Sequence, residues 1–109
     1  MHELSITQSV VDAVCERAAG RTVHSVKVQV GALTAVVPEA MRFCFELVVE
    51  GTVAQGARLD IERRAGAGHC RSCAADIALD DLILLCPCGS ADVYVTAGRE
   101  LQIVSMEVG

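Results

Sequence analysis

Aromatic side chains are scarce in this chain of 109 residues. Phe43, Phe45 and Tyr94 are the only three, and there is no tryptophan. Hydrophobic residues nevertheless make up 52% of the sequence, so a core can form, which argues against global disorder. That core must be aliphatic. The length suits one compact domain, or a small domain with a satellite module.

A long apolar run and a basic leader are also missing. No stretch approaches the roughly 20 apolar residues that span a bilayer. The start lacks the basic and apolar regions of a signal peptide. We therefore expect a cytoplasmic protein without a membrane partner. In a reducing compartment, the six cysteines indicate metal ligands, core residues or redox groups before they indicate disulfides.

An excess of positive charge is lacking as well. Nine lysines and arginines stand against fourteen acidic residues, which gives a formal net charge of −5. An acidic chain receives no electrostatic help in binding phosphate backbones. The charge balance favours cationic partners or metal ions, and we expect no nucleic-acid binding.

The hydrophobic periodicity predicts an α+β fold. It indicates, in chain order, a helix, a strand, a helix, a strand and a last strand over residues 4–19, 22–33, 38–51, 57–65 and 100–108. Because the last strand cannot stand alone, we expect a small mixed sheet of three strands with both helices on one face. The alternation slips between Ile103 and Val104, which predicts a bulge or a strand buried on both faces.

The composition changes at Gly66. Residues 66–97 contain four of the six cysteines and three of the nine glycines, without a clear helical period. We therefore expect an inserted module over residues 66–97. The surrounding domain would comprise residues 1–65 and would be completed by the strand 98–109.

Four cysteines in the inserted module have the spacing of a zinc site. Cys70-x2-Cys73 is followed, after twelve intervening residues, by Cys86-x-Cys88. Two pairs of thiols separated by the length of a hairpin are typical of tetrahedral thiolate zinc. The module has little apolar mass, so the metal would have to contribute to its folding free energy. We predict Zn²⁺ bound by Cys70, Cys73, Cys86 and Cys88.

Alternatives remain for this module. One residue rather than two separates Cys86 from Cys88, so this pair of thiols would chelate the metal with a smaller bite than a C-x2-C pair. His69 could replace one of the thiols as a ligand, or it could be an exposed loop residue. A redox role for Cys70 and Cys73 would call for a neighbouring βαβ unit, and the sequence shows no such pattern. A further alternative is a zinc ribbon that binds nucleic acid. The module's formal charge of −3, from one arginine and four aspartates, disfavours contact with phosphates. A catalytic zinc would need an open position, whereas four thiols close the shell.

The opening tripeptide offers a second metal site. The α-amine of Met1, with the backbone nitrogen and the imidazole of His2, places three nitrogen donors in one chelate. Glu3 could add a fourth donor through its backbone nitrogen or its carboxylate. Such a set suits a square-planar or tetragonal ion such as nickel or copper, provided that Met1 has a free amine. In the alternative interpretation, His2 is a frayed terminal residue.

Several motifs occur together along the chain: Met1-His2-Glu3-Leu4-Ser5, Val28-Gln29-Val30-Gly31, Pro38-Glu39, Gly56-Ala57, the four cysteines, Cys88-Gly89-Ser90 and Gly98-Arg99-Glu100-Leu101. In this combination the chain resembles, nearly end to end, the HypA/HybF hydrogenase maturation factors, which are nickel chaperones. It departs from the family pattern at Cys86-Pro87-Cys88, where the family usually has two residues between the thiols.

The resemblance implies a nickel metallochaperone and not an enzyme. It would deliver Ni²⁺ for maturation of NiFe-hydrogenase and, in some members, of urease. His2 would be the essential nickel ligand, with the Met1 amine and Glu3 beside it, and the four cysteines would hold a structural zinc. The implied partners are a nickel-handling GTPase, the hydrogenase large subunit precursor and a second copy in a homodimer.

Overall fold

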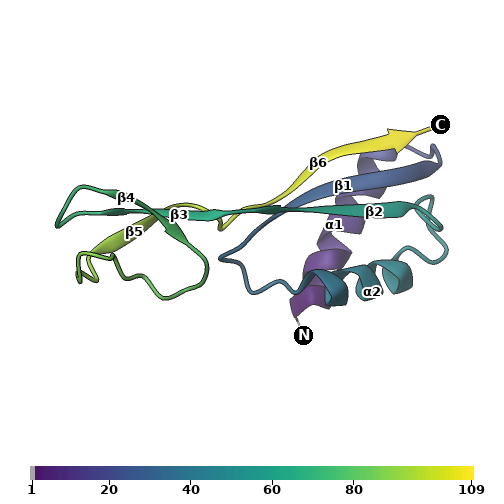
Figure 1. Cartoon of the computed structure of the whole chain (residues 1–109). Coiled ribbons are helices and arrows are strands. Elements are labelled where there is room, and N and C mark those ends of the chain that lie inside the picture. Colours follow the sequence, from purple (N-terminus) through teal and green to yellow (C-terminus); the bar gives the residue numbers. More distant parts are fainter. Residues whose placement is uncertain (1) are drawn as a thin grey trace. The chain divides into compact units, whose positions relative to one another are not determined.

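The computed structural model describes residues 2–109, so Met1 lies outside the described residues. Two helices and six strands follow one another in the order α1 (His2–Ala18), β1 (Val23–Gly31), α2 (Pro38–Val48), β2 (Arg58–Arg64), β3 (Gly66–Cys70), β4 (Asp76–Leu79), β5 (Val93–Ala97) and β6 (Leu101–Val108) (Figure 1). The strands form two three-stranded sheets, which confirms the α+β fold. Within residues 2–109, neither helix is long and apolar enough to cross a membrane.

The first sheet has the strand order β2-β1-β6. Val26, Val28 and Val30 share one face of the central strand β1 and are fully buried. The opposite face carries Lys27, whose ammonium lies 3.1 Å from the Glu62 carboxylate of β2 while both side chains stay about half exposed. Helices α1 and α2 pack against each other and bury their own apolar faces. One face of this sheet is therefore covered and the other meets solvent.

Strands β1 and β2 run parallel. The Val23 N–H donates to the Val53 carbonyl at 2.9 Å, and the Ala32 N–H donates to the Arg64 carbonyl at 2.8 Å, so the residue numbers rise together along both segments. A parallel pair needs a crossover connection, which α2 provides. The segment β1–α2–β2 is thus a βαβ unit. The interpretation that no such unit precedes the cysteines is wrong.

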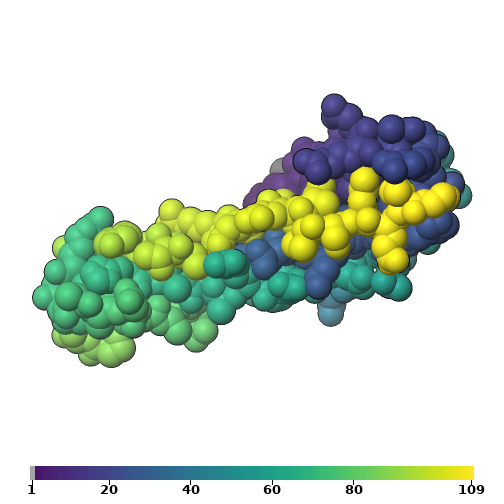
Figure 2. All heavy atoms as spheres, turned by 90° about the horizontal axis from the view of Figure 1, so that it is seen from above, coloured from purple at the N-terminus to yellow at the C-terminus, as the bar shows by residue number. Residues whose placement is uncertain are grey.

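Strand β6 runs antiparallel to β1. The Gly31 N–H donates to the Glu100 carbonyl at 2.7 Å at one end, and the Gly109 N–H donates to the Thr22 carbonyl at 3.0 Å at the other. The alternation of burial along β6 slips once, at residues 104–105, where two consecutive side chains are exposed. The space-filling view shows this strand, in yellow, at the surface beside α1 (Figure 2).

The second sheet has the order β4-β3-β5 and is antiparallel throughout. The sequence does not predict β3, because Gly66-Ala67-Gly68 lacks the β-branched and aromatic residues that mark strands. The glycines are required by close packing. A Cβ added at Gly66 would lie 2.2 Å from the Leu79 carbonyl oxygen, and one at Gly68 would lie 2.8 Å from a Leu79 methyl group.

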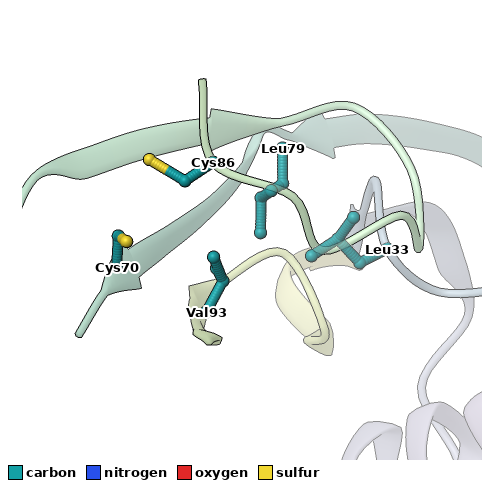
Figure 3. Packing of buried hydrophobic residues seen from close by; sticks show 5 residues of the cluster. All are labelled: Leu33, Cys70, Leu79, Cys86 and Val93. Atoms are coloured by element: carbon teal, nitrogen blue, oxygen red, sulfur yellow. The ribbon is translucent and has the colours of Figure 1, made fainter. Parts of the chain in front are cut away.

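Contacts divide the chain into two compact units. The first contains residues 2–28, 36–62 and 102–109, and the second contains residues 29–35 and 63–101. Segment 29–35 packs with the second unit because Leu33 belongs to its core, together with Leu79, Val93 and two of the cysteines (Figure 3). The functional division at residues 66 and 97 stays a prediction, since compact units and functional domains need not coincide.

We expect Gly66→Ala to lower the free energy of unfolding of the second unit by about 1–3 kcal/mol, because the added methyl group meets backbone rather than a flexible side chain. Urea denaturation of the zinc-loaded protein measures the change. Ala78→Ser adds one atom to an exposed position of the neighbouring strand β4 and is the matched control. Equal loss in both variants would contradict the close packing of β3.

Candidate metal centres

The sulfur atoms of Cys70, Cys73, Cys86 and Cys88 form one cluster, with all four Sγ atoms within 4.8 Å of one another. Within this cluster, the Sγ atoms of Cys70 and Cys88 lie 3.7 Å apart and those of Cys73 and Cys86 lie 3.6 Å apart. A tetrahedron with Zn–S bonds of about 2.3 Å has edges of about 3.8 Å. The sulfur cluster therefore has the size of a four-thiolate zinc site. All four are free thiols rather than disulfides.

A turn at the end of β3 supplies the first pair of thiols. The Cys70 N–H donates to the Ala75 carbonyl, and the Ala74 N–H donates to the Cys70 carbonyl, both at 2.9 Å. Ala74 adopts a φ of +62°, in the left-handed region that non-glycine residues rarely enter. This backbone places the buried Cys70 and the exposed Cys73 on the same side of the turn.

The second pair lies on a tighter turn. The Cys86 N–H donates to the Ser90 carbonyl at 2.9 Å, and the Gly89 N–H donates to the Cys86 carbonyl at 2.8 Å. Gly89 has a φ of +95°, which suits glycine. The Cys88 N–H also lies 3.5 Å from the Cys86 sulfur. The missing residue between Cys86 and Cys88 therefore does not prevent both thiols from joining the sulfur cluster.

A hydroxyl contact joins these two turns. The side-chain oxygens of Ser72 and Ser90 lie 2.8 Å apart, one between the first pair of cysteines and the other just after the second pair. Figure 3 shows Cys70 and Cys86 at one end of the small hydrophobic cluster that also contains Leu79. The sequence singles out neither serine, because the pairing of two hydroxyls from separate turns leaves no signal in residue spacing.

His69 lies outside the sulfur cluster. Its Nδ1 is 2.8 Å from the Asp76 carboxylate, and its ring packs at 5.4 Å from the Tyr94 ring. The Arg71 guanidinium lies 4.4 Å from the centre of the same Tyr94 ring. Because side chains alternate along β3, His69 and Cys70 point to opposite faces. In this geometry the histidine orders the outer face of the sheet instead of replacing a thiol.

Backbone hydrogen bonds, desolvation and neighbouring thiols displace the pKa values of Cys70 and Cys86 in opposite directions. The backbone N–H of Cys73, helped by that of Ser72, outweighs desolvation and lowers the pKa of Cys70 to about 6. The Cys88 N–H lowers the pKa of Cys86, but desolvation and the neighbouring thiols outweigh it and raise this pKa to about 12. Without a cation, a thiolate at Cys70 makes a second one at Cys86 unfavourable. A divalent ion removes that conflict.

The geometry also bears on the redox interpretation. A redox role for Cys70 and Cys73 is not excluded by the lack of a βαβ unit, because β1–α2–β2 is such a unit. All four sulfurs, however, lie within 4.8 Å of one another, and contacts join Cys70 to Cys88 and Cys73 to Cys86 from one turn to the other. A redox pair would be expected within Cys70-x2-Cys73. A closed group of four fits metal binding better.

His2 begins α1 and is exposed. The backbone N–H groups in the first turn of a helix are not part of its repeating N–H to carbonyl ladder, and His2 and Glu3 lie in the first turn of α1. The Glu3 side chain is half buried, and its carboxylate accepts a hydrogen bond from the Val37 N–H at 3.3 Å. The predicted donor at Met1 lies outside the described residues.

Comparison with known proteins places the chain in a family. A family model described as hydrogenase/urease nickel incorporation, metallochaperone, hypA matches residues 1–108. The chain belongs to this family. HypA proteins are metallochaperones and maturation factors rather than enzymes, and the family binds nickel.

Relatives of the HypA family match over nearly the whole chain. A hydrogenase maturation factor HypA from Geobacter sulfurreducens is 47% identical, over 99% of both chains. One from Nostoc punctiforme is 43% identical, over 99% of this chain and 96% of its own length. The solution structure of the nickel metallochaperone HypA from Helicobacter pylori has a TM-score of 0.68 at 27% identity, over 99% of this chain and 97% of that one.

We expect zinc affinity to fall with acid, and to fall more steeply below about pH 6, where Cys70 also becomes protonated in the metal-free protein. At neutral pH, the zinc ion must already displace the proton of Cys86, whose pKa is raised. Competition with a chromophoric chelator, from about pH 8 to about pH 5, measures how zinc affinity changes with pH. This range brackets the Cys70 pKa. A constant affinity over this range would contradict thiolate ligation.

Proposed function

We propose that this chain is a cytoplasmic nickel metallochaperone that binds Ni²⁺ at His2 and delivers it by ligand exchange to the precursor of a NiFe-hydrogenase. Its family membership supports a role in nickel incorporation. The observation that carries the site assignment is the exposed His2 at the first residue of α1. A carrier must release its ion, and an exposed site at a helix start is open to an incoming ligand.

The proposed ligands are nitrogen atoms of the first residues. The His2 imidazole and the backbone nitrogens of His2 and Glu3 belong to the first turn of α1, whose amides are not part of the repeating hydrogen-bond ladder of the helix. The Met1 amine completes the proposed set. Four nitrogens suit square-planar Ni²⁺. Binding displaces protons from these donors, so nickel affinity falls with acid.

The zinc is proposed to have a structural role. Four thiolates close a tetrahedral shell and leave no open position for a substrate. Residues 66–97 would form the zinc-binding module, and residues 1–65 with 98–109 would form the nickel-binding domain. The hydrophobic cluster beside the sulfur atoms is small, which supports a contribution of the metal to the stability of the module.

Selectivity for nickel is proposed to come from the partners. A nitrogen chelate binds Cu²⁺ more tightly than Ni²⁺, so the ligands alone do not select nickel. A nickel-handling GTPase and the hydrogenase large subunit precursor are the proposed source and recipient, and a second copy of the chain is a proposed partner in a homodimer. These partners follow from the resemblance to the HypA/HybF family.

We expect His2→Ala to weaken nickel binding at least about tenfold, because one lost donor is worth more than about 1.4 kcal/mol. The measurement is a nickel titration of zinc-loaded protein with a native start. His24→Ala, at an exposed position in β1, is the matched control and should bind like the parent. A residue added before Met1 should also weaken binding. Unchanged affinity in His2→Ala would refute the site assignment.

A further inference from the structure

Helix α2 begins without a cap of its own. Its N-cap residue, Val37, is extended, with φ −93° and ψ 115°, and makes no side-chain capping bond. Valine has no side-chain acceptor, unlike the Ser, Thr, Asp or Asn that usually occupy this position. The positive end of the helix dipole favours negatively charged groups near this helix start, and Glu39 in the first turn of α2 is one of them.

Glu3 of α1 places a carboxylate at this helix start. One of its carboxylate oxygens accepts the hydrogen bond from the Val37 N–H at 3.3 Å, from 34 positions away in the sequence. The two helices pack against each other, so the contact links the first turn of α1 to the entrance of α2. Glu3 is half buried, whereas its neighbour His2 is exposed.

Two hydroxyls hold the same turn from its carbonyl side. The Ser5 Oγ donates to the His2 carbonyl at 3.2 Å, and the Thr7 Oγ1 donates to the Glu3 carbonyl. Thr7 is fully buried and anchors this bond in the core. The carbonyls and the Glu3 carboxylate are thus held by the protein. The backbone nitrogens of His2 and Glu3 point toward the start of the helix, as the first N–H groups of any helix do.

We propose that Glu3 is a positioning residue, whose carboxylate docks on the Val37 amide and thereby holds the first turn of α1 in the geometry that presents its nitrogen donors. This inference rests on the proposed nickel site. It assigns the carboxylate to α2 and not to the metal. The bond from Thr7 supports the same turn, so Glu3 is held through its side chain by Val37 and through its backbone carbonyl by Thr7.

Comparison of Glu3→Gln with Glu3→Ala, in zinc-loaded protein with a native start, tests this role. Glutamine keeps an oxygen that can accept the Val37 N–H but is a poor nickel ligand, so Glu3→Gln should bind nickel nearly as tightly as the parent. Glu3→Ala should bind about 10- to 100-fold more weakly, as is usual when a group that orients metal ligands is removed. Glu39→Gln removes an exposed charge in the first turn of α2 and should leave affinity unchanged.

The Val37 amide resonance provides the direct readout. In the metal-free protein it should move upfield in Glu3→Ala and stay near its parent position in Glu3→Gln. In the parent it should keep the shift of a bonded amide when Ni²⁺ is added, because square-planar Ni²⁺ is diamagnetic and the carboxylate stays in place. A loss of that shift on nickel loading, or equal weakening in Glu3→Gln and Glu3→Ala, would overturn the proposal.

The two parts of the experiment separate this inference from the proposed function. If the parent protein binds no nickel, the carrier function fails, while the metal-free spectra still report whether Glu3 holds the Val37 amide. If nickel binds and His2→Ala abolishes binding, but Glu3→Ala changes neither the affinity nor the Val37 resonance, the carrier function stands and the positioning role is wrong.

Discussion

The close approach of four cysteine sulfurs, which disfavours their ionisation together without a cation, is the constraint on which the second unit depends. The Sγ atoms of Cys70 and Cys86 belong to a group no wider than 4.8 Å, and their pKa values are displaced in opposite directions. A metal-free cluster of this kind resists full ionisation, whereas a divalent cation stabilises four thiolates at once. The two turns that carry the cysteines belong to the sheet β4-β3-β5, one following β3 and the other preceding β5.

The two proposed metal sites differ in chemistry and in openness. The sulfur cluster offers soft donors in a closed tetrahedral shell, which suits a resident zinc ion. The start of α1 offers nitrogen donors at an exposed His2, which suits an ion that must leave again. A helix start is well adapted to this use, because its first amides are not needed by the helix itself. The contact of Glu3 with Val37 joins this first turn to the start of α2.

The sequence predicts what is periodic or closely spaced. The apolar stripes of α1 and α2, the alternating valines of β1 and the spacing of the four cysteines led to the α+β fold and to the cysteine cluster, both of which the structure confirms. Strand β3 was missed because its inward positions are glycines, which pack closely but carry no hydrophobic signal. The parallel pairing of β1 with β2, and the bond between Glu3 and Val37, join distant segments and leave no local pattern.

Amide hydrogen exchange before and after removal of zinc by a chelator tests most directly whether the metal holds the second unit. The account predicts that the amides of β3, β4 and β5 lose their protection without zinc, because the hydrophobic cluster there is small. The amides of α1 and α2 should keep theirs, since their core of valines, Met41 and Phe45 is separate from the sulfur cluster. Unchanged protection of β3 in the zinc-free protein would contradict the account.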